Sequence, residues 1–194
     1  CALTGKKTIL LSMPIRQTYA EYDRAKNHIA DLEKRFPNVS SMDIDLTSSF
    51  DQLEKDFPED VAEHALAMAN TRSRLRMATL YAIGQVHGCL VCGTGNKVED
   101  FGVGFYTKYG DGGVDLSPIA DLNKTEVWGL AAEVGVIQEI VDAKPTDGLW
   151  ADGRSDEDQI GASYPELEWA MDYNGDGSIL SERQEEVLII YIRL

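Results

Sequence analysis

The sequence predicts a three-layer α/β domain, a parallel sheet with helices on both faces. Apolar segments of strand length alternate with longer segments of helical periodicity. Residues 8–13 ("TILLSM") and 89–94 ("CLVCGT") are short and mostly apolar, a pattern typical of strands buried on both faces. Helical segments between them are long enough for right-handed crossovers. With 194 residues, 43% of them hydrophobic, the chain has the size of one domain.

The other elements of the first half follow in order. Residues 18–36 form a helix rich in i,i+4 opposite charges. Residues 40–46 alternate apolar side chains with acids, which predicts a less buried strand near a sheet edge. Residues 47–57 and 61–86 are expected to be helical, the second segment being small or apolar nearly all round.

Capping patterns predict the helices of the second half. Asn123 can cap a helix that begins at Lys124, and Glu126 completes a capping box. Further helices are expected from residues 155–158 ("SDED"), over residues 164–173, and after a Ser181–Gln184 cap.

The charge balance excludes several classes of partner. The formal net charge of −15 argues against a nucleic-acid or membrane-surface protein, since its field repels polyanions. Any phosphate site must therefore be local. No run of 18 apolar residues is present, and three cysteines fit a reducing compartment, so we expect a cytoplasmic protein with neither nucleic acid nor membrane as a partner.

The turn after the second apolar strand is a candidate phosphate site. In "CGTGNKVED", Gly93 and Gly95 permit close backbone approach, and Thr94 offers a hydroxyl. Asn96 can cap the next helix. Glu99 then has two interpretations, the capping partner of Asn96 or a Mg²⁺ ligand, and its spacing alone favours the cap.

One arginine of the 61–86 helix is singled out by geometry. At 100° per residue, Arg72 and Arg76 share a face, whereas Arg74 points the opposite way. A structural ion pair with one of the many acids is the simpler expectation for Arg74. The alternative is a ligand carboxylate or phosphate, which a guanidinium matches well.

Residues 106–115 ("YTKYGDGGVD") combine both signs of charge with three glycines. Lys108, Asp111 and Asp115 could be presented by a loop that folds over a ligand with phosphates and hydroxyls. A solvated surface turn is the plainer alternative.

Taken together, these segments resemble a known family. The series "NTRSRLRM … LVCGTGNKVED … GFYTKYGDGGVDLSPIADLNKT … KPTDGLW … SDEDQIGASYPELE" is similar to the ammonia-dependent NAD⁺ synthetases, members of the ATP pyrophosphatase group. The resemblance covers residues 70–168, roughly half of the chain. It implies a single Rossmann-like domain over residues 1–194, of the adenine nucleotide alpha hydrolase-like type.

The resemblance implies a ligase. It would adenylate the carboxylate of deamido-NAD⁺ with Mg-ATP, release pyrophosphate, and let ammonia displace AMP to give NAD⁺. The implied ATP-binding residues are Thr94, Lys124 and Thr146. The implied deamido-NAD⁺-binding residues are Arg74, Lys108 and Asp115. Glu99 would bind Mg²⁺, and a homodimer is implied.

Two departures from the family pattern concern the ends of the chain. The glycine- and serine-rich pyrophosphate loop and a C-terminal His-Lys pair are not found between Cys1 and Leu194. We therefore expect a domain incomplete at both ends, which by itself binds ATP poorly and turns over little.

Two other interpretations stay open. The chain could belong to an ATP pyrophosphatase that activates a different acid, or to a non-catalytic nucleotide-binding or calcium-stabilised module. For calcium, Asp172, Asn174, Asp176, Gly177 and Ile179 fit an EF-hand-like loop. Its twelfth position should be glutamate and is Arg183, so a polar turn is favoured.

Overall fold

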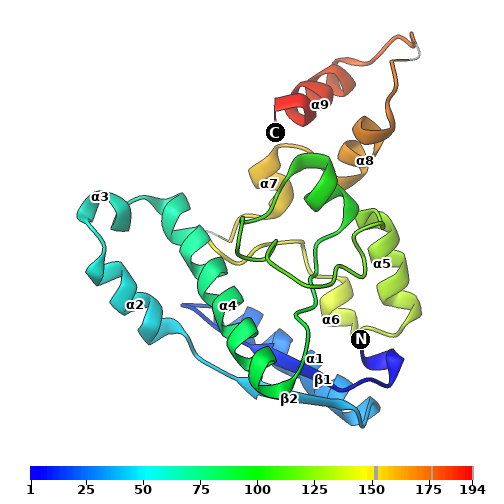
Figure 1. Cartoon of the computed structure of the whole chain (residues 1–194). Coiled ribbons are helices and arrows are strands. Elements are labelled where there is room, and N and C mark those ends of the chain that lie inside the picture. The colour runs from blue at the N-terminus through cyan, green and yellow to red at the C-terminus, as the bar shows by residue number, and fades with distance from the viewer. Residues whose placement is uncertain (151–152, 176, 194) are drawn as a thin grey trace. The chain divides into compact units, whose positions relative to one another are not determined.

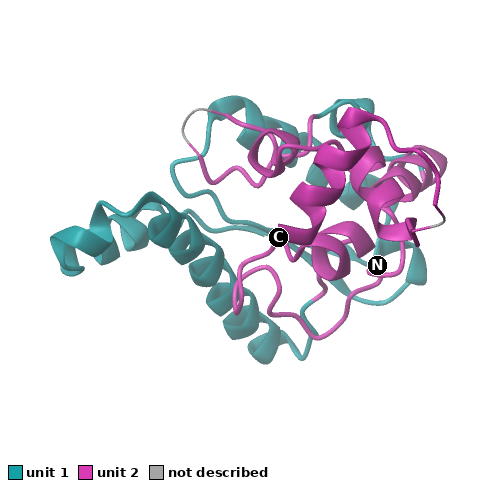
Figure 2. Cartoon of the chain, turned by 90° about the horizontal axis from the view of Figure 1, so that it is seen from above, with its two compact units in different colours: residues 1–91, 135–143 teal, residues 92–134, 144–194 magenta. Residues whose placement is uncertain are grey.

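A computed structural model describes residues 1–150, 153–175 and 177–193 of the protein. The chain divides into two compact units, coloured separately in Figure 2. The first comprises residues 1–91 and 135–143, and the second residues 92–134 and 144–194. The single domain expected over residues 1–194 stays a prediction.

The first unit contains a parallel β-α-β arrangement (Figure 1). Strand β1 (Thr8–Ser12) pairs with β2 (Val39–Asp43), with Thr8 opposite Val39 and Ser12 opposite Asp43. Helix α1 (Tyr19–Arg35) connects them. Because parallel strands require such a crossover, this part of the α/β prediction is confirmed.

Local sequence explains where α1 begins and how it ends. The Thr18 hydroxyl accepts a hydrogen bond from the Glu21 N–H, and the Glu21 carboxylate accepts one from the Thr18 N–H, which forms a capping box. Lys34 and Arg35 lie in the last turn, where positive charge complements the helix dipole.

One prediction for β1 is wrong. Its residues were expected to be buried on both faces, but only Ser12 is buried and the others are half-buried. Within the described residues the sheet has two strands, so β1 has one hydrogen-bonded neighbour and its surroundings cover it only in part.

Helices complete the first unit around a small core. The bounds are η1 (Ala2–Thr4, a 3-10 turn), α2 (Thr47–Asp56), α3 (Glu59–Ala62), α4 (Ala65–His87) and α6 (Gln138–Val141). The core residues are Ile15, Leu46, Phe50 and Met68.

The helix predicted over residues 61–86 is interrupted. α3 ends before Glu63, and His64 starts α4 because its Nδ1 accepts a hydrogen bond from the Ala67 N–H at 3.2 Å. At the other end Gly88 adopts φ 63°, a left-handed conformation that glycine takes without steric cost.

The second unit is mostly helical. Its elements are η2 (Val98–Val103, a π-helical turn), α5 (Lys124–Glu133), α7 (Asp156–Ile160), α8 (Tyr164–Asp172) and α9 (Glu182–Arg193). Its core includes Val98, Val103, Ile160, Tyr164, Leu167 and Val187. The predicted capping residues lie at the expected helix starts, as the Ser181–Gln184 hydrogen bonds before α9 illustrate.

The second buried strand, expected over residues 89–94, does not form. Residue Cys92 makes an isolated parallel bridge with Leu116, and the Gly93 N–H donates to the Leu116 carbonyl at 2.7 Å. Leu90 is 66% exposed, whereas Val91 is buried. The apolar pattern predicted burial, but a strand also needs a continuous hydrogen-bonded neighbour, which the described residues do not supply here.

Among the described residues, no helix is both long enough and apolar enough to cross a membrane.

Candidate functional site

The turn after Gly95 is organised by a reciprocal cap. Asn96, which is buried, accepts hydrogen bonds at its Oδ1 from the N–H groups of Val98 and Glu99, at 3.0 and 3.1 Å. Glu99 Oε2 in turn accepts the Asn96 N–H at 3.2 Å. The capping interpretation of Glu99 is therefore confirmed.

The second oxygen of Glu99 lies in a buried polar cluster. Glu99 Oε1 lies 2.8 Å from Lys124 Nζ and accepts a hydrogen bond from the Tyr164 hydroxyl, also at 2.8 Å. The exposed fractions of the Lys124 and Glu99 side chains are 17% and 14%. Lys124 Nζ also lies 4.8 Å from the centre of the Tyr164 ring. One carboxylate thus serves a cap and an ion pair together.

Asp156 belongs to the same cluster through its contact with the Tyr164 hydroxyl. The two residues are 6% and 0% exposed, and the Tyr164 hydroxyl lies 3.1 Å from Asp156 Oδ2. The other oxygen of Asp156, Oδ1, is buried and has no hydrogen-bond partner among the described residues. A charged carboxylate is costly in such a place, so the neutral form is favoured.

Burial and the hydrogen bonds of the cluster shift the pKa of its members. Burial raises the pKa of Asp156, and the bond from Tyr164 offsets this only in part. Burial opposes the charged form of Glu99, yet Lys124, Tyr164 and the Asn96 N–H hold the pKa of Glu99 below its usual value. Burial and the two carboxylates raise the pKa of Tyr164. Tyr164 therefore stays protonated, and its hydroxyl lies within hydrogen-bond distance of both carboxylates, at 2.8 Å from Glu99 and 3.1 Å from Asp156.

Helix α8 also anchors the start of α5, where Lys124 lies. Glu168 accepts the Thr125 N–H at 3.0 Å and the Thr125 hydroxyl at 2.7 Å. Glu126 accepts the Asn123 N–H at 2.7 Å. Protein carboxylates thus satisfy these donors at the start of the helix that carries Lys124.

The two glycines of the predicted phosphate turn lie close to side chains of the protein itself. A Cβ on Gly93 would lie 2.8 Å from Val114 Cγ2, and one on Gly95 would collide with the Asp100 carboxylate. The expected close backbone approach is thus made to protein side chains. Thr94 lies between the glycines and is exposed.

Thr146 lies in a turn of the second unit. Its hydroxyl donates to the Arg154 carbonyl at 3.2 Å and accepts the Gly148 N–H at 3.1 Å. The residue is exposed, so the turn leaves it open to solvent while fixing its side chain.

The glycine-rich segment 106–115 folds into consecutive turns. The Gly110 N–H donates to the Thr107 carbonyl at 2.8 Å, and Asp111 Oδ1 accepts the Thr107 N–H at 3.1 Å. Lys108 and Asp115 are exposed. The described geometry fits a surface turn that presents charged side chains, and a ligand-covering role stays a prediction.

Arg74 belongs to the first unit. Arg76 donates to the Met13 carbonyl and to Gln17, both at 3.0 Å, and Arg72 lies 5.0 Å from the centre of the Phe50 ring. Arg74 is exposed. The predicted separation of Arg74 from the other two arginines is thus confirmed.

Of the seven predicted site residues, Glu99 and Lys124 are brought into direct contact. Thr94, Lys108, Asp115 and Thr146 lie in the same unit, on exposed segments. Tyr164 and Asp156 were not predicted. The first was assigned only to a helix start and the second only to a short acidic helix, because their distant partners leave no local spacing to detect.

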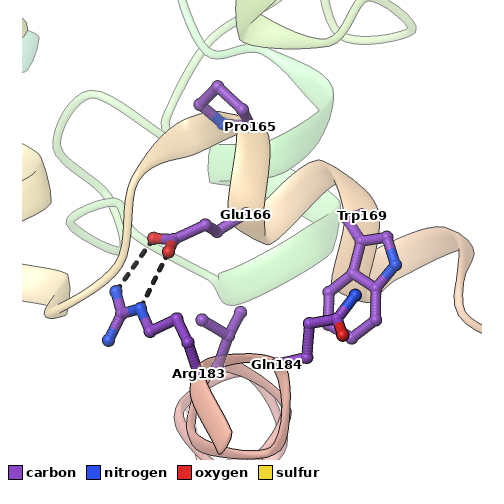
Figure 3. A pocket seen from close by; sticks show the side chains of 6 residues that line it. Pro165, Glu166, Trp169, Arg183 and Gln184 are labelled. Atoms are coloured by element: carbon purple, nitrogen blue, oxygen red, sulfur yellow. Dashed lines mark hydrogen bonds and ion pairs between the residues drawn. The ribbon is translucent and has the colours of Figure 1, made fainter. Parts of the chain in front are cut away.

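A pocket between helices α8 and α9 is separate from these contacts (Figure 3). It has a volume of about 240 Å³ and is lined by Pro165, Glu166, Trp169, Arg183, Gln184 and Val187. Across it the Arg183 guanidinium faces the Glu166 carboxylate with hydrogen bonds of 2.8 and 2.9 Å. The two charged side chains that line the pocket thus pair with each other.

The possible calcium loop gains no support from the described residues. Asp176 lies outside them, and within them no group of three acids, histidines or cysteines is placed to hold a metal ion. Arg183, at the position of the expected glutamate, pairs with Glu166 and Glu186.

Comparison with known protein families identifies the family of this chain. The family model described as NAD synthase matches residues 1–188. The chain belongs to the NAD synthase family. This match extends well beyond the segments of residues 70–168 that first indicated the resemblance.

Individual relatives of known name support the same family. The chain is 46% identical over 140 residues to an NH(3)-dependent NAD(+) synthetase of Mycoplasmopsis pulmonis, covering 72% of this chain and 52% of that relative. It is 37% identical over 164 residues to the enzyme of that name from Finegoldia magna, covering 84% and 64%. The chain therefore spans about half to two thirds of the length of these relatives.

Solved structures place the NAD synthase chain in an α/β, Rossmann-like fold. An NMN synthetase from Francisella tularensis superposes with a TM-score of 0.81 at 28% identity, over 98% of this chain and 76% of that one. An NH3-dependent NAD synthetase from Campylobacter jejuni gives a TM-score of 0.69 at 24% identity, over 95% and 72%. The second likeness concerns the fold alone.

Proposed function

We propose that the protein containing this chain is an ammonia-dependent NAD⁺ synthetase. The family match over residues 1–188 is the observation that supports this most directly. In the proposed reaction, Mg-ATP adenylates the carboxylate of deamido-NAD⁺ with release of pyrophosphate, and ammonia then displaces AMP. A free carboxylate is a poor acyl donor, whereas its mixed anhydride with AMP has a good leaving group.

The chain's own residues would contribute charge and position. Lys124 is a partly buried cation paired with Glu99, and Glu99 also accepts a hydrogen bond from Tyr164. Lys124 can therefore turn to a phosphate while Glu99 keeps a hydrogen-bond donor. The proposed ATP-binding residues are Thr94, Lys124 and Thr146. The proposed deamido-NAD⁺-binding residues are Arg74, Lys108 and Asp115.

Glu99 fits the proposed role of Mg²⁺ ligand. Its lowered pKa keeps it charged, and Oε2 accepts one backbone N–H, which leaves a lone pair for a cation. Mg²⁺ is commonly held by one or two carboxylates together with substrate phosphates. When bound, the ion would supply positive charge next to those phosphates.

Three further features belong to the same proposal. We propose a sheet with helices on both faces, of which β1 and β2 are two strands, by likeness to the superposed structures. We also propose a homodimer, by the same family resemblance, and a cytoplasmic location, where ATP is available.

The decisive experiment is an activity assay of the protein that contains this chain. With Mg-ATP and ammonium we expect deamido-NAD⁺ to be converted to NAD⁺ with one AMP and one pyrophosphate per turnover, as measured by chromatography. Omission of ammonium should stop NAD⁺ formation. Failure to consume deamido-NAD⁺ would refute the proposed substrate.

A second candidate acts on a smaller acid. The superposition on an NMN synthetase, with a TM-score of 0.81, favours amidation of nicotinate mononucleotide. Competition between the two acids in one reaction separates the candidates, because the ratio of products gives the ratio of kcat/KM values. A product that is mainly NMN would replace the first candidate.

A further inference from the structure

We infer that Tyr164 is a positioning residue that holds Glu99 in place when Lys124 turns to ATP. The inference rests on the proposed function and deepens it. Tyr164 is the first residue of α8 and lies 65 residues beyond Glu99 in the chain, so the contact is made by tertiary structure.

Both parts of the Tyr164 side chain contact the ion pair. The hydroxyl donates to Glu99 Oε1 at 2.8 Å, the same oxygen that Lys124 contacts at 2.8 Å. The face of the ring lies under Lys124 Nζ, 4.8 Å from its centre. One side chain therefore holds the carboxylate by a hydrogen bond and contacts the ammonium through the face of its ring.

The surroundings of Tyr164 leave it little freedom. It is fully buried, and its N–H donates to Glu157 Oε1 at 2.9 Å. Trp128 packs edge-on against its ring at 6.1 Å between centres, and Asp156 lies 3.1 Å from its hydroxyl. A side chain packed on so many sides keeps its position, so it can hold Glu99 in place when Lys124 moves.

The physical need for such a group follows from burial. If Lys124 leaves Glu99 for a phosphate, the carboxylate loses its closest counter-charge in a place that is 14% exposed. Removing one partner of a buried ion pair is costly unless other donors remain. With the Tyr164 hydroxyl and the Asn96 N–H, Glu99 keeps a donor on each oxygen. Tyr164 thus lowers the free-energy cost of committing Lys124 to ATP.

Tyr164→Phe tests this inference, with Tyr173→Phe as the matched control. The first change removes the hydroxyl and keeps the ring. Tyr173 is a half-buried tyrosine at the end of the same helix, packed against Trp169. Isothermal titration calorimetry on the protein containing this chain would measure Kd for Mg-ATP and, separately, for deamido-NAD⁺. Thermal unfolding would report the Tm of each variant.

For Tyr164→Phe we expect the Kd of Mg-ATP to rise about tenfold to a hundredfold, the loss of one hydrogen bond to a charged group, with the Kd of deamido-NAD⁺ within twofold of wild type. Tyr173→Phe should change neither value. An unchanged Mg-ATP affinity, or an equal loss of both affinities with a lower Tm, would show that Tyr164 is merely structural.

Crystal structures without nucleotide provide the second measurement. In Tyr164→Phe we expect the Glu99 carboxylate to rotate away from the variant ring and Lys124 Nζ to move with it. An unchanged Glu99 position would overturn the inference. This readout is independent of the reaction: if wild type binds no Mg-ATP the proposed function fails, while the position of Glu99 still decides the role of Tyr164.

Discussion

At the residue scale, Glu99 combines two roles that the sequence presented as alternatives. Its Oε2 completes the cap with Asn96, and its Oε1 pairs with Lys124. A carboxylate has about four lone-pair sites, so a cap uses only a part of its capacity. A capping residue at the edge of a polar cluster should therefore not be dismissed as purely structural.

Arg74 provides the prediction that belongs to this scale. Because Arg74 is exposed and the proposed function places it on deamido-NAD⁺, we expect Arg74→Ala to weaken deamido-NAD⁺ binding by about 1.5–3 kcal/mol, the range for a charge-assisted hydrogen bond. Calorimetric titration of the protein containing the chain measures this. Arg193→Ala, an exposed change on α9, is the control. An unaltered affinity would assign Arg74 a structural role.

At the element scale, α8 connects the parts of the second unit. Tyr164 and Glu168 are four residues apart, so they share one helix face, from which Tyr164 reaches Glu99 and Glu168 reaches Thr125. Glu166 contacts Arg183 of α9 from another side. One helix of nine residues thereby positions α5 and α9 as well as the candidate site.

The Glu166–Arg183 contact predicts a pH dependence. Hydrogen bonds from Arg183 lower the pKa of Glu166 from about 4.5 to about 2. A depressed pKa means that the folded state binds fewer protons, so the stabilisation is complete above about pH 4.5 and is lost as the pH falls through about 2. We expect Glu166→Gln to lower Tm by about 1–3 °C at neutral pH, since the pair is partly exposed.

Thermal unfolding from pH 7 to pH 2 checks this dependence. The difference in Tm between wild type and Glu166→Gln should shrink to zero as the pH falls. Glu185→Gln, an exposed change on α9, should show no such trend. A difference that stays constant down to pH 2 would contradict the assigned pKa.

At the scale of the whole molecule, acidic residues clearly outnumber basic ones. There are 33 acidic and 18 basic residues, which gives a net charge of −15. Such an excess repels polyanions and opposes compaction through self-repulsion. Within it, Lys124 is held beside a buried carboxylate and an aromatic ring. A local cation can thus be available to one phosphate group while the molecule stays unattractive to nucleic acid.

Self-repulsion predicts that moderate salt stabilises the chain. Raising NaCl from about 0.01 to 0.15 M shortens the Debye length from about 30 to 8 Å, which screens distant acids more than contacting ion pairs. We expect Tm to rise by a few degrees, measured by circular dichroism, with KCl giving the same result. A fall in Tm would mean that attractive pairs outweigh the repulsion.

The family of this protein and much of its local structure could be predicted from the amino-acid sequence. Caps such as Asn123–Glu126 and Asn96–Glu99, and the β1–α1–β2 order, depend on residues close together in the chain, so they could be predicted. The motif series indicated the NAD synthase family because motif order is itself a property of sequence. Helix and strand patterns report burial and period, which are local as well.

The contacts between side chains that are distant in the sequence are known only from the folded structure. Tyr164 contacts Glu99, which lies 65 residues away in the sequence, and Glu168 contacts Thr125, which lies 43 residues away. Separations of this size follow no helical or capping spacing, so neither contact could be predicted. The strand expected over residues 89–94 was wrong for the same reason: its apolar residues predict burial, but a strand forms only where a neighbouring backbone supplies hydrogen bonds. Contacts between residues distant in sequence depend on how the whole chain packs, so a local sequence pattern cannot predict them.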